Sequence, residues 1–278
     1  MDLFPFCWRG RWTSVLRSRT MAAYQAGQPM TNPSPPPARW TDLRRFTAAR
    51  VALGRAGNGL PTAAHLAFQA AHAAARDAVH AKLDVTTLRR DLADAGLDSL
   101  AVRSAAPDRR IYLLRPDLGR RLIPDDRAAL PQAPDAMVFV VADGLSATAV
   151  QRHAAALLHG VVPPLRAEGV VAPVIVAEQG RVALGDDIGQ AMGAQAVAVL
   201  IGERPGLSAA DSLGVYLTWQ PRVGRTDAER NCISNIRPEG LAVPDAAAKL
   251  LWLIRAMRRL HQTGIHLKDD QPTRLLPG

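Results

Sequence analysis

The sequence predicts an α/β protein in which an N-terminal helical region precedes a mainly parallel sheet with helices on both of its faces. Two observations predict this class. Short apolar runs recur after residue 135, and each has the length of a strand that is buried on both faces. Segments with the apolar spacing of helices separate these runs, and such alternation is typical of parallel sheets.

A proline-rich segment, residues 29–37, predicts where the folded part of the chain begins. Proline fits neither a helix interior nor a central strand, so we expect the first structured residue near Trp40. The arginine-rich residues 1–20 are interpreted either as a disordered tail or as a misread upstream start, since Met21 opens an ordinary N-terminus. The three expected parts are a tail with its linker at 1–39, a helical region at 40–105 and a sheet domain at 106–278.

The helical region carries three helix patterns, but no recognisable chemistry. Thr62 is positioned to cap the second helix, and Gly96 to end the third. His65 and His72 share a face of the second helix, yet no third ligand stands at a suitable spacing, so we expect no metal site. The three helices are expected from Thr41 to Gly54, from Thr62 to about Lys82 and from Thr86 to Ala95.

The sheet domain opens with a predicted strand at 111–114, which leads into an arginine-rich turn. Apolar runs predict four further strands, at 136–142, 170–177, 196–201 and 213–219. Helices are expected from Ser146 to about His159, from Asp186 to Met192 and from Asp245 to Gly264. The last of these is the clearest, because its acidic start and basic end suit the helix dipole.

Composition excludes some classes of protein. No apolar run approaches the ~20 residues that span a bilayer, so we expect no membrane insertion. The net charge of +9 allows anionic partners, but the arginines are dispersed and aromatic residues make up only 5 %, which disfavours nucleic acid. The only cysteines, Cys7 and Cys232, lie far apart, which excludes a disulfide framework and favours the reducing cytoplasm.

Polar loops follow the predicted strands, at the positions where open α/β sheets bind their ligands. The loop 231–239 holds a thiol, a hydroxyl, two amides and a guanidinium, a density that suits the amide-rich rim of a large cofactor. No glycine-rich dinucleotide or P-loop fingerprint follows any strand, and no catalytic triad can be assembled. The four loops of interest are 143–146, 178–182, 202–206 and 231–239.

Eight blocks of the sequence are distinctive when they are taken together. They are LRRFTAARVALGRAG (43–57), ARDAVHA (75–81), YLLRPDLGRRL (112–122), VADGLSATAV (141–150), GRVALGDDIG (180–189), LIGERPGL (200–207), DSLGVYLT (211–218) and RNCISNIRPEGL (230–241). In this order they resemble the small (light) subunit of adenosylcobalamin-dependent ethanolamine ammonia-lyase. Several long blocks in register are a highly specific signal, and only residues 1–40 fall outside the resemblance.

The resemblance implies a fold and a reaction. Enzymes of this family convert ethanolamine to acetaldehyde and ammonia through an adenosyl radical generated from adenosylcobalamin. A large subunit holds the substrate, while the small subunit closes over the cobalamin with a Rossmann-like domain, expected here at 106–278. The chain is thus expected to have no catalytic residues, and to contact the large subunit of a hetero-oligomer through 40–105. The stoichiometry, and housing in a bacterial microcompartment, stay open.

Motif matching also implies which residues contact the corrinoid: Val182, Glu203 and Cys232, with Arg181 and the Asp143-Gly144 turn as weaker candidates. A structural thiol and a redox nucleophile remain alternatives for Cys232. The histidines add an independent point, because none of the seven has an aspartate two residues before it. An Asp-x-His-x-x-Gly loop, which replaces the lower base of cobalamin, is therefore absent, and we expect the cofactor to bind base-on.

Two hypotheses from other classes remain. The first is a Rossmann-like module that binds another nucleotide or coenzyme without catalysis, although the missing glycine-rich fingerprint weighs against it. The second is a basic RNA-binding or scaffold protein, for which the net charge is the only support.

Overall fold

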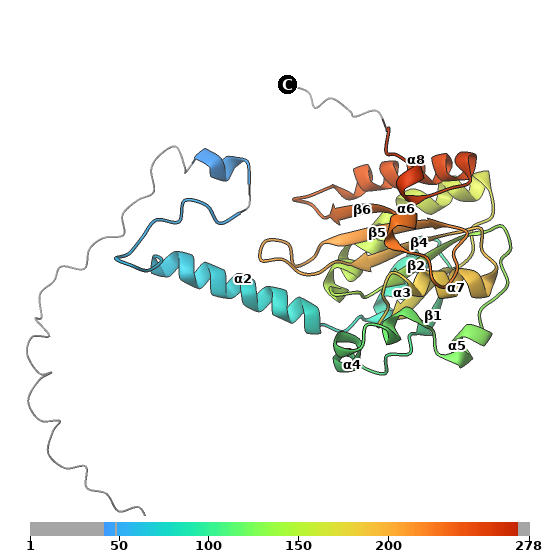
Figure 1. Ribbon diagram of the computed structural model, residues 1–278, viewed down its shortest axis with the longest axis horizontal. Helices are drawn as coiled ribbons and strands as arrows, with labels where there is room; N and C mark the ends of the chain where they lie inside the picture. The colour runs from blue at the N-terminus through green and yellow to red at the C-terminus, as the bar shows by residue number, and fades with distance from the viewer. Residues whose placement is uncertain (1–41, 48, 272–278) are drawn as a thin grey trace, which may run out of the picture. The chain divides into compact units, whose positions relative to one another are not determined.

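The structure, a computed structural model, describes residues 42–47 and 49–271 (Figure 1). The tail expected at 1–39 lies outside the described residues. Contacts divide the chain into two compact units, residues 1–65 and 66–278. The second unit contains every strand of the sheet, so it also contains the predicted ligand-binding edge.

The described part of the first unit contains one short 3-10 helix, η1 (Leu43–Arg45). The longer helix expected from residue 41 is therefore wrong. The Arg44 guanidinium instead donates to the carbonyl of Val51 at 3.1 Å, and Ala52 has a φ of 55°. A residue in this left-handed conformation ends a right-handed helix.

The other two helices of the N-terminal region form as predicted. They are α2 (Thr62–His80) and α3 (Val85–Asp94). The Asp84 carboxylate caps α3 by accepting a backbone N–H at 2.9 Å, and Gly96 follows the helix with a φ of 74°. The next strand, β1 (Ser99–Arg103), escapes prediction because only one of its residues is buried, which leaves no apolar run.

Residues 111–114, expected as a strand, belong to the helix α4 (Arg109–Leu114), so this prediction is wrong. The Asp108 carboxylate accepts a hydrogen bond from the N–H of Ile111 at 2.8 Å, and this cap outweighs the strand-like run of apolar residues. Two short elements follow, η2 (Leu118–Arg120) and α5 (Pro124–Ala128).

The sheet is mixed and has the strand order β1-β3-β2-β4-β5-β6. Its first four strands are parallel, whereas β5 and β6 are antiparallel to their neighbours. The expectation of a mainly parallel sheet thus applies to four strands of six. The strands after β1 are β2 (Met137–Ala142), β3 (Val174–Glu178), β4 (Ala196–Gly202), β5 (Leu213–Trp219) and β6 (Asn231–Ile236).

Two strands differ from their predicted bounds. Strand β3 begins after Pro173, whose nitrogen cannot donate to the ladder, and not at residue 170. Residues 231–236 form β6 rather than a loop. Only Ile233 and Ile236 of β6 are buried, so the strand carries the polar composition of an exposed edge.

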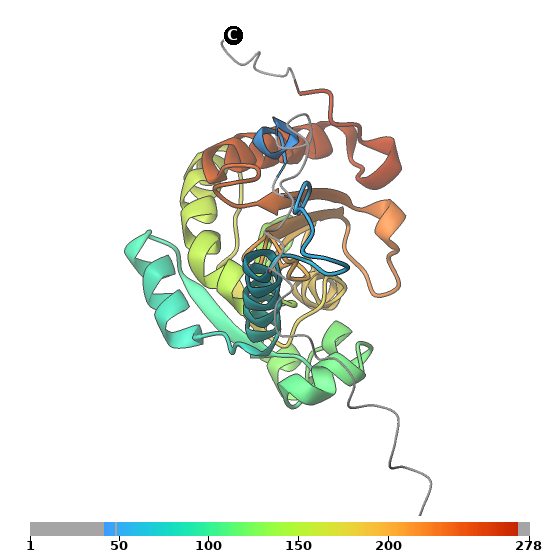
Figure 2. The same ribbon diagram turned by 90° about the vertical axis from the view of Figure 1, so that its left-hand side faces the viewer.

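Helices cover both faces of the sheet, as predicted (Figures 1 and 2). Helices α3, α6 and α8 pack on one face, and α7 packs on the other. Helix α6 continues past the predicted end through Pro163 and Pro164, because Val161, Val162 and Leu165 are buried against the core. The bounds are α6 (Ala147–Glu168), α7 (Leu184–Met192), α8 (Val243–Leu260), η3 (Asp227–Glu229) and η4 (Gly264–His266).

Candidate functional site

The carboxyl ends of β2, β3 and β4 lie at one edge of the sheet, which presents the loops selected from the sequence. Strand β2 leads through Asp143 into α6, and β3 leads through Gln179 into α7. Because α6 and α7 pack on opposite faces, the neighbouring strands β2 and β3 send their loops in opposite directions. Open α/β sheets bind ligands in the crevice formed at such a switch point.

Helix α4 fills this crevice with the side chain of Arg109, which is 9 % exposed. Its Nη1 donates to the carbonyl of Gly144 at 2.8 Å and lies 3.4 Å from Oδ2 of Asp143. The same nitrogen lies 3.5 Å from Oε1 of Gln179, while Nε donates to the carbonyl of Val79 in α2 at 2.6 Å. One guanidinium therefore joins α2 to the loops that follow β2 and β3.

The backbone of Gly180 is held on both sides. Its N–H donates to Oδ1 of Asp143, and its carbonyl accepts a hydrogen bond from the Tyr112 hydroxyl, both at 3.0 Å. A Cβ at residue 180 would stand 2.8 Å from a side-chain atom of β2, so glycine lets the loop approach this closely. The two hydrogen bonds fix the start of the segment that carries Arg181 and Val182.

Asp143 and Gly144 face the interior of the protein. Asp143 is 2 % exposed, and its desolvation raises the pKa of the carboxyl to about 6, although Arg109 and the N–H of Gly180 act in the opposite direction. Gly144 has a φ of 56°, and a Cβ there would lie 2.3 Å from the carbonyl oxygen of Gly202. The two residues thus hold the neighbouring loops together.

Arg181 and Val182 follow this buried layer. The Arg181 guanidinium lies 4.2 Å from the centroid of the Tyr112 ring, and its Nη2 donates to the Tyr112 carbonyl at 3.3 Å. Among the described residues no group accepts a hydrogen bond from the buried Nε of Arg181. Val182 is half-buried and packs against the apolar cluster beneath α7.

Glu203 connects the chain before β5 to the end of β6. Its Oε2 accepts hydrogen bonds from the hydroxyl of Ser212 and from the N–H of Asn235, the latter at 3.2 Å. In the described parts of the chain, no group donates to the other carboxylate oxygen, Oε1. Glu203 is therefore a fixed side chain with a free acceptor, and not a solvated turn residue.

Cys232 lies opposite Tyr216 in the antiparallel pair of β6 and β5. This register makes the thiol and the phenol neighbours across the two strands. Desolvation of the sulfur raises the pKa of the exposed Cys232 thiol, and the charges of Glu203 and Asp227 raise it further. The raised pKa keeps the thiol protonated, which disfavours the nucleophile alternative, and its exposure disfavours a buried structural thiol.

The face of β5 and β6 that carries Tyr216 and Cys232 has no helix over it in the described part of the chain. Helix α7 packs on β4 on this side, whereas the helices against β5 and β6, α6 and α8, lie on the opposite side. Val182 at the start of α7 and Glu203 after β4 border the same side. We call this surface, defined by Val182, Glu203, Tyr216 and Cys232, the open face.

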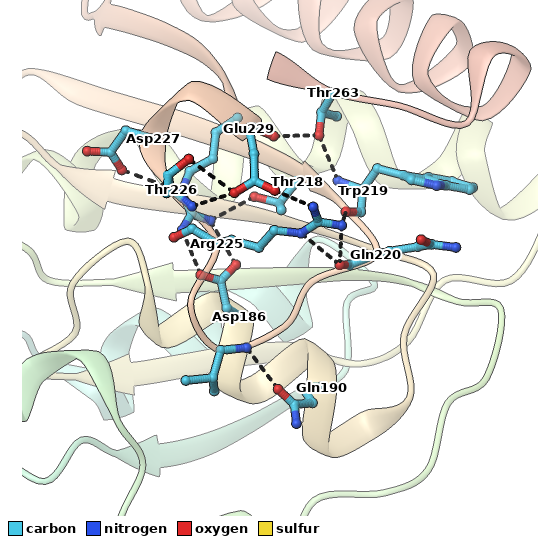
Figure 3. Close-up of polar contacts among 12 residues, drawn as sticks. Asp186, Gln190, Thr218, Trp219, Gln220, Arg225, Thr226, Asp227, Glu229 and Thr263 are labelled. Atoms are coloured by element: carbon cyan, nitrogen blue, oxygen red, sulfur yellow. Dashed lines mark hydrogen bonds and ion pairs between the residues drawn. The ribbon is translucent and has the colours of Figure 1, made fainter. Parts of the chain in front are cut away.

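A buried ion pair anchors the loop 220–230, and Figure 3 shows the polar contacts of this loop with Asp186 and its other neighbours. Arg230 donates two hydrogen bonds to the Asp186 carboxylate of α7, at 2.7 and 2.6 Å, and one to the Thr218 hydroxyl at 3.0 Å. Both charged side chains are almost fully buried. Because Cys232 follows two residues later, this ion pair sets where β6 begins.

A cavity of about 310 Å³ lies at the ends of β1 and β3. Gln179 belongs both to this cavity and to the cluster around Arg109. The cavity is lined by Arg103, Ser104, Ala105, Ala106, Pro107, Ile123, Glu178 and Gln179.

Three residues of this site, Arg109, Tyr112 and Tyr216, escape sequence reasoning. Arg109 and Tyr112 come from α4, which the sequence misassigns as a strand, and they reach the site only through the tertiary fold. Tyr216 had an available signal, since alternation in residues 213–219 places it opposite the buried leucines. Pairing with β6 could not be foreseen, because residues 231–239 read as a loop.

Within residues 42–47 and 49–271, no group of three or more His, Cys, Asp or Glu side chains could hold a metal ion. No helix in that part of the chain is long and apolar enough to cross a membrane.

Comparisons with known proteins give a consistent result. Residues 37–268 match the family described as ethanolamine ammonia-lyase light chain (EutC). The ethanolamine ammonia-lyase small subunit of Azotobacter vinelandii is 56 % identical over 246 residues, which cover 86 % of this chain and 91 % of the relative. The small subunits of Ralstonia nicotianae and Xanthomonas campestris are 54 % and 53 % identical, over 85 % and 89 % of this chain and 90 % and 94 % of the relatives.

Proposed function

The chain belongs to the ethanolamine ammonia-lyase light-chain family, and from this membership we propose how it acts as the small subunit of that lyase. It binds adenosylcobalamin together with the large subunit, on which the substrate site lies. When bound, the cofactor supplies the radical chemistry that splits ethanolamine into acetaldehyde and ammonia. The residues of this chain bind and orient the cofactor and exclude water from it.

The observation that carries the cofactor proposal is the open face. Corrinoid side chains end in amides, which both donate and accept hydrogen bonds, so they need acceptors and donors around an apolar floor. Glu203 offers its free Oε1 as an acceptor, and Cys232 offers an exposed thiol beside the Tyr216 hydroxyl. Val182 adds an apolar contact at the border. These groups fit a corrinoid.

The other candidates act from behind the open face. Asp143 holds the N–H of Gly180, Gly144 permits the close approach of β4, and Arg181 packs on Tyr112. In this assignment they shape the loop that presents Val182. A base-on cofactor suits the chain, because no histidine stands in the sequence context that replaces the lower base.

The architecture supports a Rossmann-like role for the sheet domain proposed at 106–278, whose sheet is completed by β1 (Ser99–Arg103) from the preceding segment. Four parallel strands with helices on both faces are the features of such domains, and the two antiparallel strands extend the sheet on the side that carries the open face.

The large subunit is the proposed partner of the helical region 40–105. Helix α2 supports this role, because only Ala75 and Ala78 of its residues are buried, while Leu66 and Phe68 are 57 % and 39 % exposed. Exposed apolar side chains along one helix are typical of a surface that a partner covers.

Reconstitution tests the proposed function. The chain and the large subunit are co-expressed, mixed with adenosylcobalamin and separated by size, and corrin absorbance is followed. We expect absorbance and ethanolamine deamination only with the pair. Deamination by this chain alone would contradict the division of labour, and a pair that binds no corrin would reject the cofactor assignment.

A further inference from the structure

The switch-point crevice between β2 and β3 is filled by this chain itself. The guanidinium of Arg109 takes the place that a ligand has in related architectures, with hydrogen bonds to the Gly144 and Val79 carbonyls. A cofactor therefore meets the neighbouring open face, and the crevice serves to hold its loops.

The burial of the Arg109 guanidinium in this crevice lowers the stability of the fold. Arg109 and Arg181 place two guanidinium groups against the Tyr112 ring, at 4.8 and 4.2 Å from its centroid. Within the described part of the chain, Asp143 is the only carboxylate that forms an ion pair with either of them. The Nη2 of Arg109 is buried and has no hydrogen-bond partner among the described residues. Burying a charged group that is incompletely paired destabilises a fold, so an apolar side chain would suit stability alone.

Arg109 instead connects its own helix, α4, to three other segments. Its Nε holds the last turn of α2, and its Nη1 contacts the loops after β2 and β3. Asp143 and Tyr112, both in contact with Arg109, hold the N–H and the carbonyl of Gly180. Two residues later the chain reaches Val182, on the border of the open face.

We propose that Arg109 is a positioning residue, which sets the Gly180–Val182 loop for cofactor binding and ties it to α2. The proposal rests on the proposed function, since the cofactor is the ligand whose binding it tunes. Arg109 touches no reacting group, and its effect passes through Gly144, Gln179 and the hydrogen bonds to Gly180.

The test uses the reconstituted two-subunit enzyme with Arg109→Ala. We expect the Kd for adenosylcobalamin, measured by corrin absorbance, to rise at least tenfold, while the KM for ethanolamine at saturating cofactor stays unchanged. Amide hydrogen exchange measured without cofactor should accelerate in residues 179–182 and stay unchanged in α8. A merely structural role would not produce this localised pattern.

Three variants sharpen the comparison. Arg127→Ala is the matched control, because Arg127 also binds a buried carboxylate, that of Asp187 at 2.9 Å, but contacts none of the cofactor loops. Tyr112→Phe removes only the hydroxyl that holds Gly180, so it should give a smaller change of the same kind. Arg109→Lys keeps the charge but offers one donor group, so it should restore part of the affinity.

The outcomes separate this inference from the proposed function. If the wild-type enzyme binds no adenosylcobalamin, the proposed function is rejected. The exchange measurement still tests whether Arg109 holds the Gly180–Val182 loop. Arg109→Ala with unchanged affinity and exchange overturns the inference, as does an equal loss of affinity in Arg127→Ala. If Arg109→Ala does not fold, the same decision falls to Arg109→Lys and Tyr112→Phe, and wild-type behaviour of both overturns it.

Discussion

The carboxylate of Glu203 occupies the space that a side chain at Gly214 would fill. A Cβ on this glycine would stand 2.9 Å from Oε1 and 3.1 Å from Cγ of Glu203. The glycine lies in β5, on the same face as Tyr216, so it gives the glutamate access to the sheet floor. There Glu203 accepts hydrogen bonds from Ser212 and Asn235. The position of the proposed corrin acceptor thus depends on a missing side chain in the neighbouring strand.

Gly214→Ala is therefore expected to weaken cofactor binding more than it weakens the fold. The flexible end of Glu203 can move away from the new methyl group, which limits the loss of stability, but the move separates Oε2 from its donors. We expect a Kd for adenosylcobalamin several-fold above wild type in the reconstituted enzyme, with little change in melting temperature. Gly206→Ala, in the loop between Glu203 and β5, is the control, since its Cβ would meet nothing closer than 4.0 Å. Equal effects of the two substitutions would contradict the argument.

Glu203→Gln keeps the shape of the side chain and removes its charge. Loss of a charge-assisted hydrogen bond to a corrin amide costs about 1.5–3 kcal/mol, which is roughly 10- to 150-fold in affinity. Titration of the cofactor into wild-type and variant enzyme, with melting temperature as the second measurement, tests this. Unaltered affinity would show that Glu203 is not one of the residues that contact the corrinoid. A collapse in melting temperature would make its hydrogen bonds to Ser212 and Asn235 its main role.

The sequence predicts the parallel core of this fold well, because its strands are buried on both faces. Every residue of β2 and β4 is buried, so each reads as an unbroken apolar run between turn residues. Edge strands lack this signal. In β1 only Val102 is buried, so this strand was not predicted. In β6 only Ile233 and Ile236 are buried, so its residues were predicted to form a loop.

The candidate site divides in the same way. Loops at strand ends can be located from the sequence, and Asp143, Arg181 and Glu203 were found there. Arg109 and Tyr112 could not be found, since a helix distant in the chain carries them into the crevice. Even for the residues that were located, the sequence does not say which side chains are buried. The burial of Asp143 follows from tertiary packing alone.

Breaking the buried pair of Arg230 and Asp186 should be strongly destabilising. Asp186→Ala leaves the Arg230 side chain, which is 2 % exposed, with the solvated carboxylate of Asp227 at 3.5 Å as its remaining ion-pair partner among the described residues, and this loss costs about 3–5 kcal/mol of unfolding free energy. Replacing both residues, by Leu at 186 and Met at 230, should cost less than either single change. Urea unfolding measures all three. Asp117→Ala, in the exposed pair with Arg115, is the control and should leave stability unchanged. A double variant less stable than both singles would contradict this.

Asp143 should give the fold a distinctive dependence on pH. Burial raises the pKa of its carboxyl from an ordinary 3.8 to about 6, so between these values the native state holds a proton that the unfolded chain has released. Its contribution to stability therefore falls as the pH rises from about 4 to 6 and is constant above that range. Asparagine does not titrate, so the unfolding free energy of wild type minus that of Asp143→Asn should decrease across this window in urea titrations. Glu229, whose pKa the N–H of Thr226 lowers to about 2, titrates mainly below this window and is common to both proteins. A difference that increases from pH 4 to 6 would mean that Arg109 and the N–H of Gly180 outweigh burial, so that Asp143 is ionised throughout.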